Sequence, residues 1–378
     1  MALIVGISGN LVAPEFTAGH LDGIGIYTLA LERELKALGH GVRRVGAPKI
    51  VRSRLVAPIS ATDRFLLPQP LSVALSHLPG GRGSVSRSVE RVIDLYHATD
   101  YMAPRLAHVP VVATLFDAIT LRRPEWANRR LRWIKNMLML AAARAADRVI
   151  AISNAGAEEI VEHFGVRPDR VRVIPLGVDA KLFVPGPPEA TRSTIARLGL
   201  REGYFLFVGT LQPRKNIQGL LAAYASLPEH VRRDRQLVIA GRVGWDADEL
   251  QDELLRQRAA GRCIWLEYAD ARDLPALYAH AQALVLPSLA EGFGLPVIEA
   301  LATGIPVIAS DLPALRETGG AFATYVRAGD TAALAEAMRA MHDHVESADA
   351  AETRRRYALG FSWRACASRT LEVYRELV

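Results

Sequence analysis

The sequence is poor in cysteine and has no long apolar run. Its only two cysteines, Cys263 and Cys366, match no spacing of a metal site or a redox motif, so we expect ordinary thiols in a reducing compartment. No stretch of about 18 apolar residues is present that would span a membrane. The start, MALIVGISGN, is short and lacks a basic region, so it predicts a buried first strand and not a secretory leader. A cytoplasmic protein is expected.

Several site motifs are also missing. The first strand ends in Gly6-Ile7-Ser8-Gly9-Asn10, which does not spell the dinucleotide-binding pattern G-x-G-x-x-G. The nearest match to D-x-D, Asp246-Ala247-Asp248, fits a helix cap better than a metal site. We therefore expect no metal ion and no resident cofactor. Despite a pI of about 9.5, no helix-turn-helix, zinc or aromatic RNA-binding signature is present, and we expect no nucleic-acid partner.

Positive charge is concentrated in the first half of the chain. Residues 1–180 hold 23 Lys and Arg against 16 Asp and Glu, whereas the remainder holds 23 against 24. This asymmetry indicates either an anionic partner of the first half, such as a membrane face or a lipid-linked phosphate, or a solubilising surface. The sequence leaves both readings open.

Short β-branched or apolar runs alternate with helical patterns along the chain, which is typical of βαβ units and parallel sheets. We expect the first series of strands at 3–7, 42–45, 95–97, 111–115 and 149–152, with helices at 24–38 and 129–146. After a Pro- and Gly-rich linker at 184–190, a second series follows. Its strands are expected at 204–208, 236–240, 263–266, 283–286 and 306–309, its helices at 217–227, 248–260, 274–279 and 296–302, and a last helix at 362–377. The pattern predicts two doubly wound α/β domains with ligands outside the strand ends.

The sharpest motif is Glu291-Gly-Phe-Gly-Leu-Pro-Val-Ile-Glu299, directly after the apolar run 283–286 and the turn Pro287-Ser288. Pro296 suits the first turn of a helix. The glycines allow a ligand to approach the backbone, and the N–H groups of a helix start suit a diphosphate or a sugar. Glu291 and Glu299 are carboxylates, which accept hydrogen bonds from sugar or ribose hydroxyls.

This motif resembles the E-x7-E signature of retaining GT-B glycosyltransferases of family 4. Other segments resemble that family in the expected order: LDGIGIYT (21–28), DRVIAISN (147–154), VIPLGVD (173–179), GTLQPRKNI (209–217) and FSWRACA (361–367). The resemblance covers essentially the whole chain. It implies a GT-B fold, with two Rossmann-like domains facing an inter-domain cleft. The acceptor-binding domain would span 1–180 with a crossing helix at 361–378, and the nucleotide-sugar-binding domain 181–360.

The resemblance also implies roles for single residues. Arg214 and Lys215 would hold the donor diphosphate, a role that suits a guanidinium and an ammonium group. Glu291 would contact the transferred sugar and Glu299 the ribose. The remaining donor-binding residues implied are the N–H groups of Phe293, Gly294 and Leu295, the N-terminal glycine loop at Gly23 and Gly25, and the base region at Tyr268, Ala269 and Asp270.

The sequence departs from the family in VVATLFDAI (111–119). Many relatives have a histidine where this chain has Phe116, next to Asp117. Asp117 remains a candidate for a polar contact or for help with the acceptor proton. His97 at a strand end, Asp100 and Arg105 are candidate acceptor contacts, although a histidine there is often only a core residue with satisfied hydrogen bonds.

The reaction implied is transfer of a hexose, with retention, to an oligosaccharide or a polyprenyl-diphosphate-linked acceptor in bacterial polysaccharide synthesis. The chain most resembles polysaccharide or O-antigen mannosyltransferases, which favours GDP-mannose as donor. A UDP-hexose or a dTDP-deoxysugar stays open, as does a nucleotide-sugar epimerase on the same architecture.

A basic, aromatic stretch contains Arg122, Arg123, Trp126, Trp133 and Lys135, with Arg129, Arg130, Arg132 and Ile134 between them. It opens an amphipathic helix. Such a segment suits an anionic membrane surface, which would make the enzyme peripheral at the inner face of the cell membrane. We expect its apolar residues to pack against the sheet and leave the role of the basic ones open.

Overall fold

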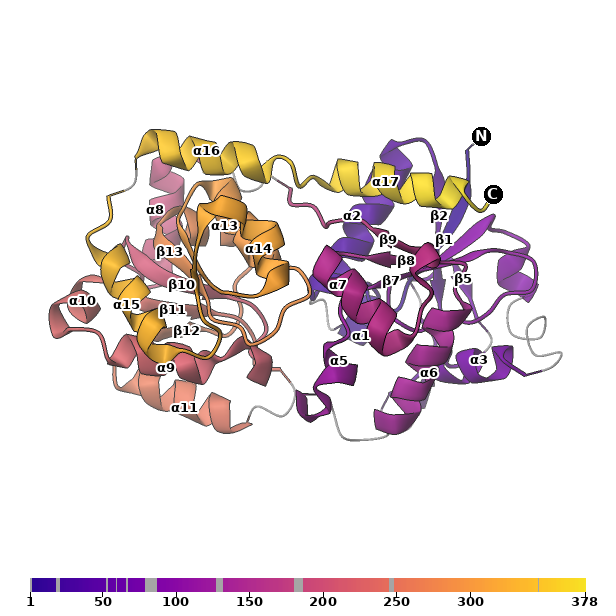
Figure 1. The fold of residues 1–378 in the computed structure, drawn as a ribbon, viewed down its shortest axis with the longest axis horizontal. Helices are drawn as coiled ribbons and strands as arrows, with labels where there is room; N and C mark the ends of the chain where they lie inside the picture. The colour runs from indigo at the N-terminus through magenta and orange to yellow at the C-terminus, as the bar shows by residue number, and fades with distance from the viewer. Residues whose placement is uncertain are drawn as a thin grey trace. The chain divides into compact units, whose positions relative to one another are not determined.

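The computed structural model describes residues 2–17, 21–51, 54–58, 60–65, 67–78, 87–126, 132–179, 186–244, 248–345 and 347–378. The chain divides into two compact units (Figure 1). Unit 1 contains Met1–Gly177 and Trp363–Val378, and unit 2 contains Val178–Ser362. The predicted division at 180/181, with the final helix returning to the first domain, lies close to these limits.

Unit 1 is built on a sheet of seven strands in the order β5-β2-β1-β6-β7-β8-β9, all of whose pairings are parallel. The strands are β1 (Ile4–Ser8), β2 (Gly41–Gly46), β5 (Asp63–Arg64), β6 (Leu95–Ala98), β7 (Val111–Leu115), β8 (Arg148–Ala151) and β9 (Val171–Val173). A separate antiparallel hairpin joins β3 (Lys49–Val51) to β4 (Arg54–Val56). Asp100 follows β6 and Asp117 follows β7, so these two predicted residues lie at the carboxyl-end edge of the sheet.

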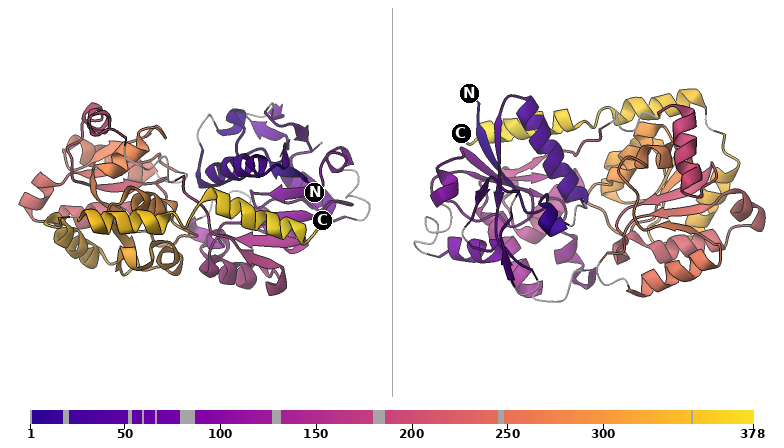
Figure 2. Two further views of the ribbon diagram at one scale, coloured as in Figure 1. Left: turned by 90° about the horizontal axis from the view of Figure 1, so that it is seen from above. Right: turned by 180° about the vertical axis from the view of Figure 1, so that it is seen from behind.

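Helices lie on both faces of this sheet (Figures 1 and 2). The helices of unit 1 are α1 (Pro14–Thr17), α2 (Gly23–Ala37), α3 (Gln69–Ser76), α5 (Ile119–Arg122), α6 (Arg132–Ala145), α7 (Asn154–Glu159) and α17 (Trp363–Arg375), with shorter turns η1 (Pro124–Trp126), η2 (Ile160–Phe164) and η3 (Pro168–Arg170). One layer pairs α2 with α17, and another pairs α3 with α6. The C-terminal helix therefore completes unit 1, as the predicted crossing helix requires.

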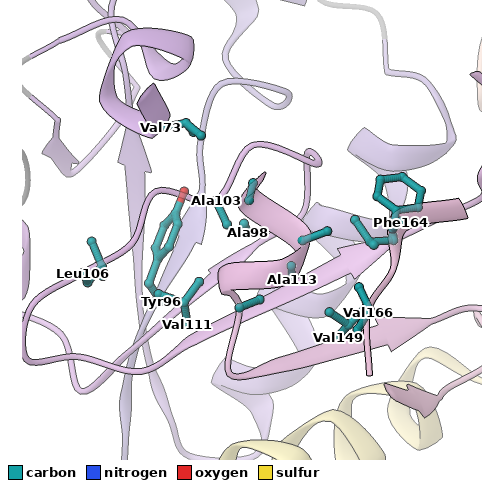
Figure 3. Packing of buried hydrophobic residues seen from close by; sticks show 14 of the residues in the cluster. Val73, Tyr96, Ala98, Ala103, Leu106, Val111, Ala113, Val149, Phe164 and Val166 are labelled. Atoms are coloured by element: carbon teal, nitrogen blue, oxygen red, sulfur yellow. The ribbon is translucent and has the colours of Figure 1, made fainter. Parts of the chain in front are cut away.

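One hydrophobic cluster of unit 1 lies between the sheet and the layer of α3 and α6. Tyr96 of β6 and Val111 of β7 are register partners and lie next to each other in this cluster, with Val73 of α3 above the sheet (Figure 3). Leu138 and Met139 of α6 are half-buried against the same cluster. Buried apolar strands of this kind are typical of a parallel sheet covered on both faces.

Unit 2 has a parallel sheet of six strands in the order β12-β11-β10-β13-β14-β15. The strands are β10 (Tyr204–Val208), β11 (Leu237–Ala240), β12 (Ile264–Leu266), β13 (Ala281–Leu286), β14 (Val307–Ser310) and β15 (Ala323–Val326). The order turns at β10, whose neighbours β11 and β13 continue in opposite directions along the sheet. A ligand site is expected at such a switch point.

The helices of unit 2 form two layers. They are α8 (Pro188–Arg197), α9 (Ile217–Ala225), α10 (Glu229–Asp234), α11 (Asp248–Ala259), α12 (Leu274–Ala279), α13 (Leu295–Thr303), α14 (Pro313–Gly319), α15 (Thr331–His342) and α16 (Ala348–Ala358), with turns η4 (Pro213–Lys215) and η5 (Gly320–Phe322). The α9 and α15 helices pack together, whereas α13 contacts α12, α14 and α16. The first and last residues of unit 2 lie side by side. Val178 forms a parallel bridge with Ser362, and the N–H of Val178 donates to Phe361 O at 2.8 Å.

Candidate functional site

Three of the four residues predicted to clasp the donor meet in unit 2. Arg214 and Lys215 lie in η4, after β10, and Glu291 lies in the loop after β13. Arg214 Nη1 donates to Glu291 Oε2 at 2.9 Å, and Lys215 Nζ donates to Glu291 Oε1. Since β10 and β13 are neighbouring parallel strands, the loops at their carboxyl ends share one edge of the sheet. We call Arg214, Lys215, Glu291 and Ser288 the charged cluster.

The charged cluster is removed from water. The Glu291 side chain is 6% exposed and that of Lys215 9% exposed, whereas that of Arg214 retains 24%. Ser288 Oγ donates a further hydrogen bond of 2.7 Å to Glu291 Oε1. Both carboxylate oxygens are thus bonded, and two cations share one anion. A second anion is what such an arrangement can bind, because its net charge is positive.

The charge state of Glu291 follows from its surroundings. Burial by itself would raise the pKa of Glu291, but the positive charges of Lys215 and Arg214 outweigh burial and lower the pKa to about 2. Glu291 is therefore ionised at neutral pH.

Main-chain contacts fix the two loops to each other. Leu289 N donates to Arg214 O at 2.7 Å. Asn216 Nδ2 donates to Pro287 O at 3.2 Å, with Asn216 in the left-handed region at φ 54°. An asparagine tolerates this conformation better than most residues. These contacts hold the basic pair and the carboxylate at a fixed spacing.

The strand ends beside the charged cluster approach each other closely. Gly209 follows β10 and Gly241 follows β11, and a Cβ on Gly241 would lie 1.9 Å from Gly209 O. No side chain fits there. The sequence analysis did not single out Gly209 or Gly241, although a glycine directly after each of two neighbouring strands is a signal that would have found them.

The motif helix begins as the sequence predicts. Gly294 is the N-cap of α13 with φ 100°, and Leu295 is the first helical residue. The buried Thr318 Oγ1 donates to Phe293 O at 3.0 Å, which holds the loop that precedes the helix. The N–H groups at the start of α13 form an anion-binding end of a helix.

Glu299 lies one turn further along α13 and bonds to a different partner. Tyr278 Oη, from α12, donates to Glu299 Oε2 at 2.6 Å. Burial raises the pKa of Glu299, and the Tyr278 hydrogen bond acts in the opposite direction. Glu299 is thus bonded by Tyr278, whereas Glu291 is bonded by Arg214 and Lys215. The sequence analysis missed Tyr278, which no local pattern distinguishes from a core tyrosine.

The predicted base region follows β12. Tyr268 is 55% exposed, Ala269 is half-buried and Asp270 precedes α12. Hydrogen bonds from Arg272 lower the pKa of Asp270 to about 2. The segment offers an exposed aromatic ring at the same sheet edge as the Gly241 turn.

The predicted glycine loop of unit 1 forms the start of α2. Asp22 is the N-cap, and its Oδ1 accepts from Gly25 N at 2.9 Å. Gly23 is the first residue of the helix, and Gly25 is buried. Gly25 N is therefore used within the helix cap, whereas the helix end itself keeps its anion-binding polarity.

Tyr101 organises the loop in which the family histidine is replaced. Tyr101 Oη accepts hydrogen bonds from Phe116 N at 3.1 Å and from Asp117 N at 3.0 Å. Its own backbone has φ 63°, which is costly for a residue with a large side chain. Phe116 is buried and packs edge-on against Tyr27. Asp117 Oδ1 accepts from Ile119 N at 3.1 Å, so its carboxylate bonds the N–H group of the first residue of α5.

The three acceptor candidates have different environments. His97 is fully buried between Tyr374 (2.6 Å to Nδ1) and Thr114 (2.8 Å to Nε2), and burial lowers its pKa to about 3. Its neutral ring ties α17 to the sheet. Asp100 Oδ2 accepts a hydrogen bond from Gln69 Nε2 at 2.7 Å. Burial raises the pKa of Asp100, whereas the Gln69 hydrogen bond and the nearby charge of Lys49 act in the opposite direction. Arg105 is half-buried, and its N–H donates to Ser76 Oγ at 3.0 Å.

Among the residues that the structure describes, no group of three or more His, Cys, Asp or Glu side chains is placed to hold a metal ion. In the D-x-D-like segment, 246 and 247 lie outside the described residues and Asp248 begins α11. No described helix is both long and apolar enough to cross a bilayer.

Known proteins resemble the chain along its whole length. Residues 193–357 match the family model "Glycosyl transferases group 1", and residues 21–182 match "Glycosyltransferase Family 4". O-antigen chain mannosyltransferase B of Escherichia coli is 30% identical, with 94% of this chain and 97% of that protein covered. An MMP alpha-(1->4)-mannosyltransferase of Mycolicibacterium hassiacum is 28% identical, with 95% and 96% covered. Among solved structures, HepE of Anabaena in complex with UDP and glucose has a TM-score of 0.75 at 18% identity, with 99% and 100% covered.

The fold and these matches define a glycosyltransferase of the GT-B type. More narrowly, the chain belongs to the family 4 glycosyltransferases, and its relatives of similar length include bacterial mannosyltransferases. The fold class and the enzyme class expected from the sequence are thereby confirmed.

Proposed function

We propose that this glycosyltransferase transfers mannose from GDP-mannose, with retention of configuration, to an oligosaccharide or a polyprenyl-diphosphate-linked acceptor in bacterial polysaccharide synthesis. The proposal that unit 2 binds a nucleotide-sugar donor rests on the charged cluster, in which Arg214 and Lys215 share the single carboxylate of Glu291. The choice of mannose is supported by the names of two relatives, an O-antigen chain mannosyltransferase and an MMP mannosyltransferase. The nucleotide sugar is the substrate, and the proposal needs no metal ion.

The donor diphosphate is bound by the cluster and by the first turn of α13. Arg214 offers a planar fork of donors and Lys215 a compact positive charge, and both suit phosphate oxygens. The N–H groups at Phe293, Gly294 and Leu295 hydrogen-bond the diphosphate or the sugar at the positive end of the helix. Glu299, held by Tyr278, accepts from the ribose hydroxyls. The base lies along Tyr268, Ala269 and Asp270.

The chemistry is a front-side displacement. As the bond from the sugar to the diphosphate breaks, the electron pair goes to the leaving phosphate oxygen, and the acceptor oxygen bonds to the same face of the sugar. The acceptor proton passes to the leaving phosphate. Arg214 and Lys215 stabilise the charge that develops on the diphosphate. Asp117, in the loop after β7, is the candidate to orient the acceptor hydroxyl, with Asp100 and Arg105 as further acceptor contacts.

Two neighbouring functions compete with this one. A UDP-hexose or a dTDP-deoxysugar would use the same cluster, and the Anabaena structure was determined with UDP and glucose. A nucleotide-sugar epimerase would consume its donor without an acceptor. The preferred nucleotide separates the first alternative from the proposal, and the need for an acceptor separates the second.

The test combines binding with turnover. A thermal-shift panel of GDP, UDP, dTDP and their sugars should give the largest shift for GDP and GDP-mannose, because at equal concentrations the tighter ligand stabilises the folded protein more. Lys215→Ala and Glu299→Ala should lower kcat/KM for GDP-mannose by two orders of magnitude or more, whereas Arg339→Ala, an exposed cation of α15, should not. Equal turnover in all three variants would exclude the assigned site. A larger shift with UDP or dTDP would replace the donor, and acceptor-independent consumption would favour the epimerase.

A further inference from the structure

The α16 helix of unit 2 packs against α13, whose first turn is proposed to bind the donor (Figure 1). Two arginines of α16 reach the carboxyl end of α13. Arg355 Nη2 donates to Thr303 O at 3.1 Å, and Arg354 Nε donates to Gly304 O at 3.0 Å. Gly304 is the C-cap of α13, and a Cβ there would lie 3.1 Å from Ala351 O of α16. The guanidinium groups bond carbonyls that the helix itself leaves open, so α16 fixes the carboxyl end of α13.

The segment after α16 is fixed as well. The N–H groups of Leu359, Gly360 and Phe361 donate to main-chain carbonyls of the last turn of α16, at 3.1, 3.0 and 3.0 Å. The carbonyl of Phe361 accepts from Val178 N at 2.8 Å. The main chain at Phe361 is therefore bonded in both directions and has a defined position relative to α16.

The ring of Phe361 reaches the loop that precedes α13. It meets the ring of Phe293 edge-on, with the ring centres 6.2 Å apart, and the ring of Tyr357 of α16 at 5.5 Å. Edge-to-face contacts of this kind are favourable for aromatic rings. Phe293 is only 4% exposed. The α16 helix and the segment after it therefore contact α13 at its carboxyl end and also contact the loop at its amino end.

Phe293 is the side chain through which this loop packs. In Gly292-Phe293-Gly294 the phenylalanine carries the only side chain, and Gly294 has φ 100°, a region that glycine enters without steric cost. The Phe293 carbonyl accepts from Thr318 Oγ1 at 3.0 Å. The direction of the N–H groups in the loop consequently depends on where the Phe293 ring packs.

We infer that Phe361 is a positioning residue for the donor, because it holds the Phe293 ring and with it the main-chain N–H groups at 293–295. Phe361 acts through Phe293 and not on the donor directly. The inference rests on the proposed function, since these N–H groups serve a donor only if unit 2 binds a nucleotide sugar. It adds a residue that lies outside the glutamate motif and at the point where the chain leaves unit 2.

A positioning role predicts a selective loss of affinity. In the proposed function the N–H groups at 293–295 bind the diphosphate or the sugar, whereas Glu299 binds the ribose and is held by Tyr278. Loosening the loop should therefore weaken a nucleotide sugar and spare a nucleoside monophosphate. A general loss of stability would instead weaken both ligands alike.

Isothermal titration of the full chain with GDP-mannose and with GMP measures this selectivity. Phe361→Ala should weaken GDP-mannose about fivefold or more, which is the scale of one lost aromatic contact, and GMP by less than about twofold. Phe361→Leu, which keeps apolar volume without a ring, should show the same selectivity and decides the question if Phe361→Ala does not fold. The matched control is Phe322→Ala, which removes another half-buried ring that packs on Tyr357, at 4.7 Å. Both of its affinities should match those of the wild type.

The outcomes separate this inference from the proposed function. Equal losses for GDP-mannose and GMP in the Phe361 variants, or no loss for either ligand, would overturn the inference and leave the donor proposal standing. The same selective loss in Phe322→Ala would also overturn it. Failure of the wild type to bind any nucleotide sugar would refute the proposed function and this inference with it. If the thermal-shift panel selects UDP, then UDP-glucose and UMP replace the guanosine ligands with the same expected selectivity.

Discussion

Lys215 donates a hydrogen bond to Glu291, and both of their side chains are less than a tenth exposed. Arg214 and Ser288 occupy the other positions around the same carboxylate. Both carboxylate oxygens of Glu291 already accept hydrogen bonds, and two of the three donors are the cations Arg214 and Lys215. The carboxylate that the family resemblance assigns to the transferred sugar therefore also holds in place the two residues that we propose to bind the diphosphate.

Replacement of Glu291 should consequently affect the nucleotide as well as the sugar. We expect Glu291→Gln to lower kcat/KM by two orders of magnitude or more, and to change the affinities for GDP and GDP-mannose by the same factor. Isothermal titration with each ligand measures this. A change confined to GDP-mannose would mean that Glu291 serves the sugar alone.

The low pKa of Glu291 predicts how stability depends on pH. Because the pKa falls from 4.5 to about 2 on folding, ionised Glu291 stabilises unit 2 fully above pH 4.5, and this contribution is lost as the pH falls through 2. The shift corresponds to a free energy on the order of 3 kcal/mol. Urea unfolding of wild type and Glu291→Gln should show a difference at pH 7 that shrinks between pH 4.5 and 2. A difference that stayed constant with pH would contradict this.

The hydrogen bond from Tyr278 to Glu299 predicts a positioning role for the tyrosine. A hydrogen bond to a charged group contributes about 1.5–3 kcal/mol, so Tyr278→Phe should raise the KM for the donor about tenfold or more while kcat changes little. Tyr224→Phe is the matched control, because the hydroxyl of Tyr224 bonds main-chain groups, among them the carbonyls of Arg232 and Arg235. An unchanged KM in Tyr278→Phe would show that Glu299 needs no partner to be placed.

Tyr101 offers a test of the loop that carries Asp117. Tyr101→Phe keeps the ring against Phe116 and Phe164 but leaves two main-chain N–H groups without their acceptor. Each such group costs about 1–3 kcal/mol if it stays buried. We expect a lower melting temperature and a lower kcat than in Tyr96→Phe, whose hydroxyl contacts Ser8 Oγ at 3.2 Å. A kcat equal to that of Tyr96→Phe would separate Tyr101 from the reaction.

Much of the fold could be predicted because its signals are local. The strands 111–115 and 204–208 and the helix 274–279 lie where the apolar runs and stop residues put them. The short strands β5, β9 and β15 escaped prediction, because two to four residues give no periodicity and depend on a neighbouring strand for their definition. The helices α3, α8, α15 and α16 were also not assigned from the sequence.

The candidate site divides in the same way. The charged cluster could be predicted, since each of its loops follows a recognisable strand and parallel neighbours end at one edge. The roles of Tyr278 and Tyr101 could not be predicted, because each tyrosine bonds to a residue that is distant in the sequence. Only the folded chain brings such residues together. Trp133 and Met137 of α6 were expected to pack against the sheet but are 66% and 56% exposed. The pattern marks this helix as amphipathic but does not say how far its apolar face extends beyond the sheet that it covers.

The bridge between Val178 and Ser362 has a practical consequence. The two ends of unit 2 are hydrogen-bonded neighbours, so a gene fragment for 178–362 would encode a chain whose termini could be joined by a very short linker. The same adjacency means that unit 2 could be replaced as a single piece between an unchanged first segment and an unchanged final helix.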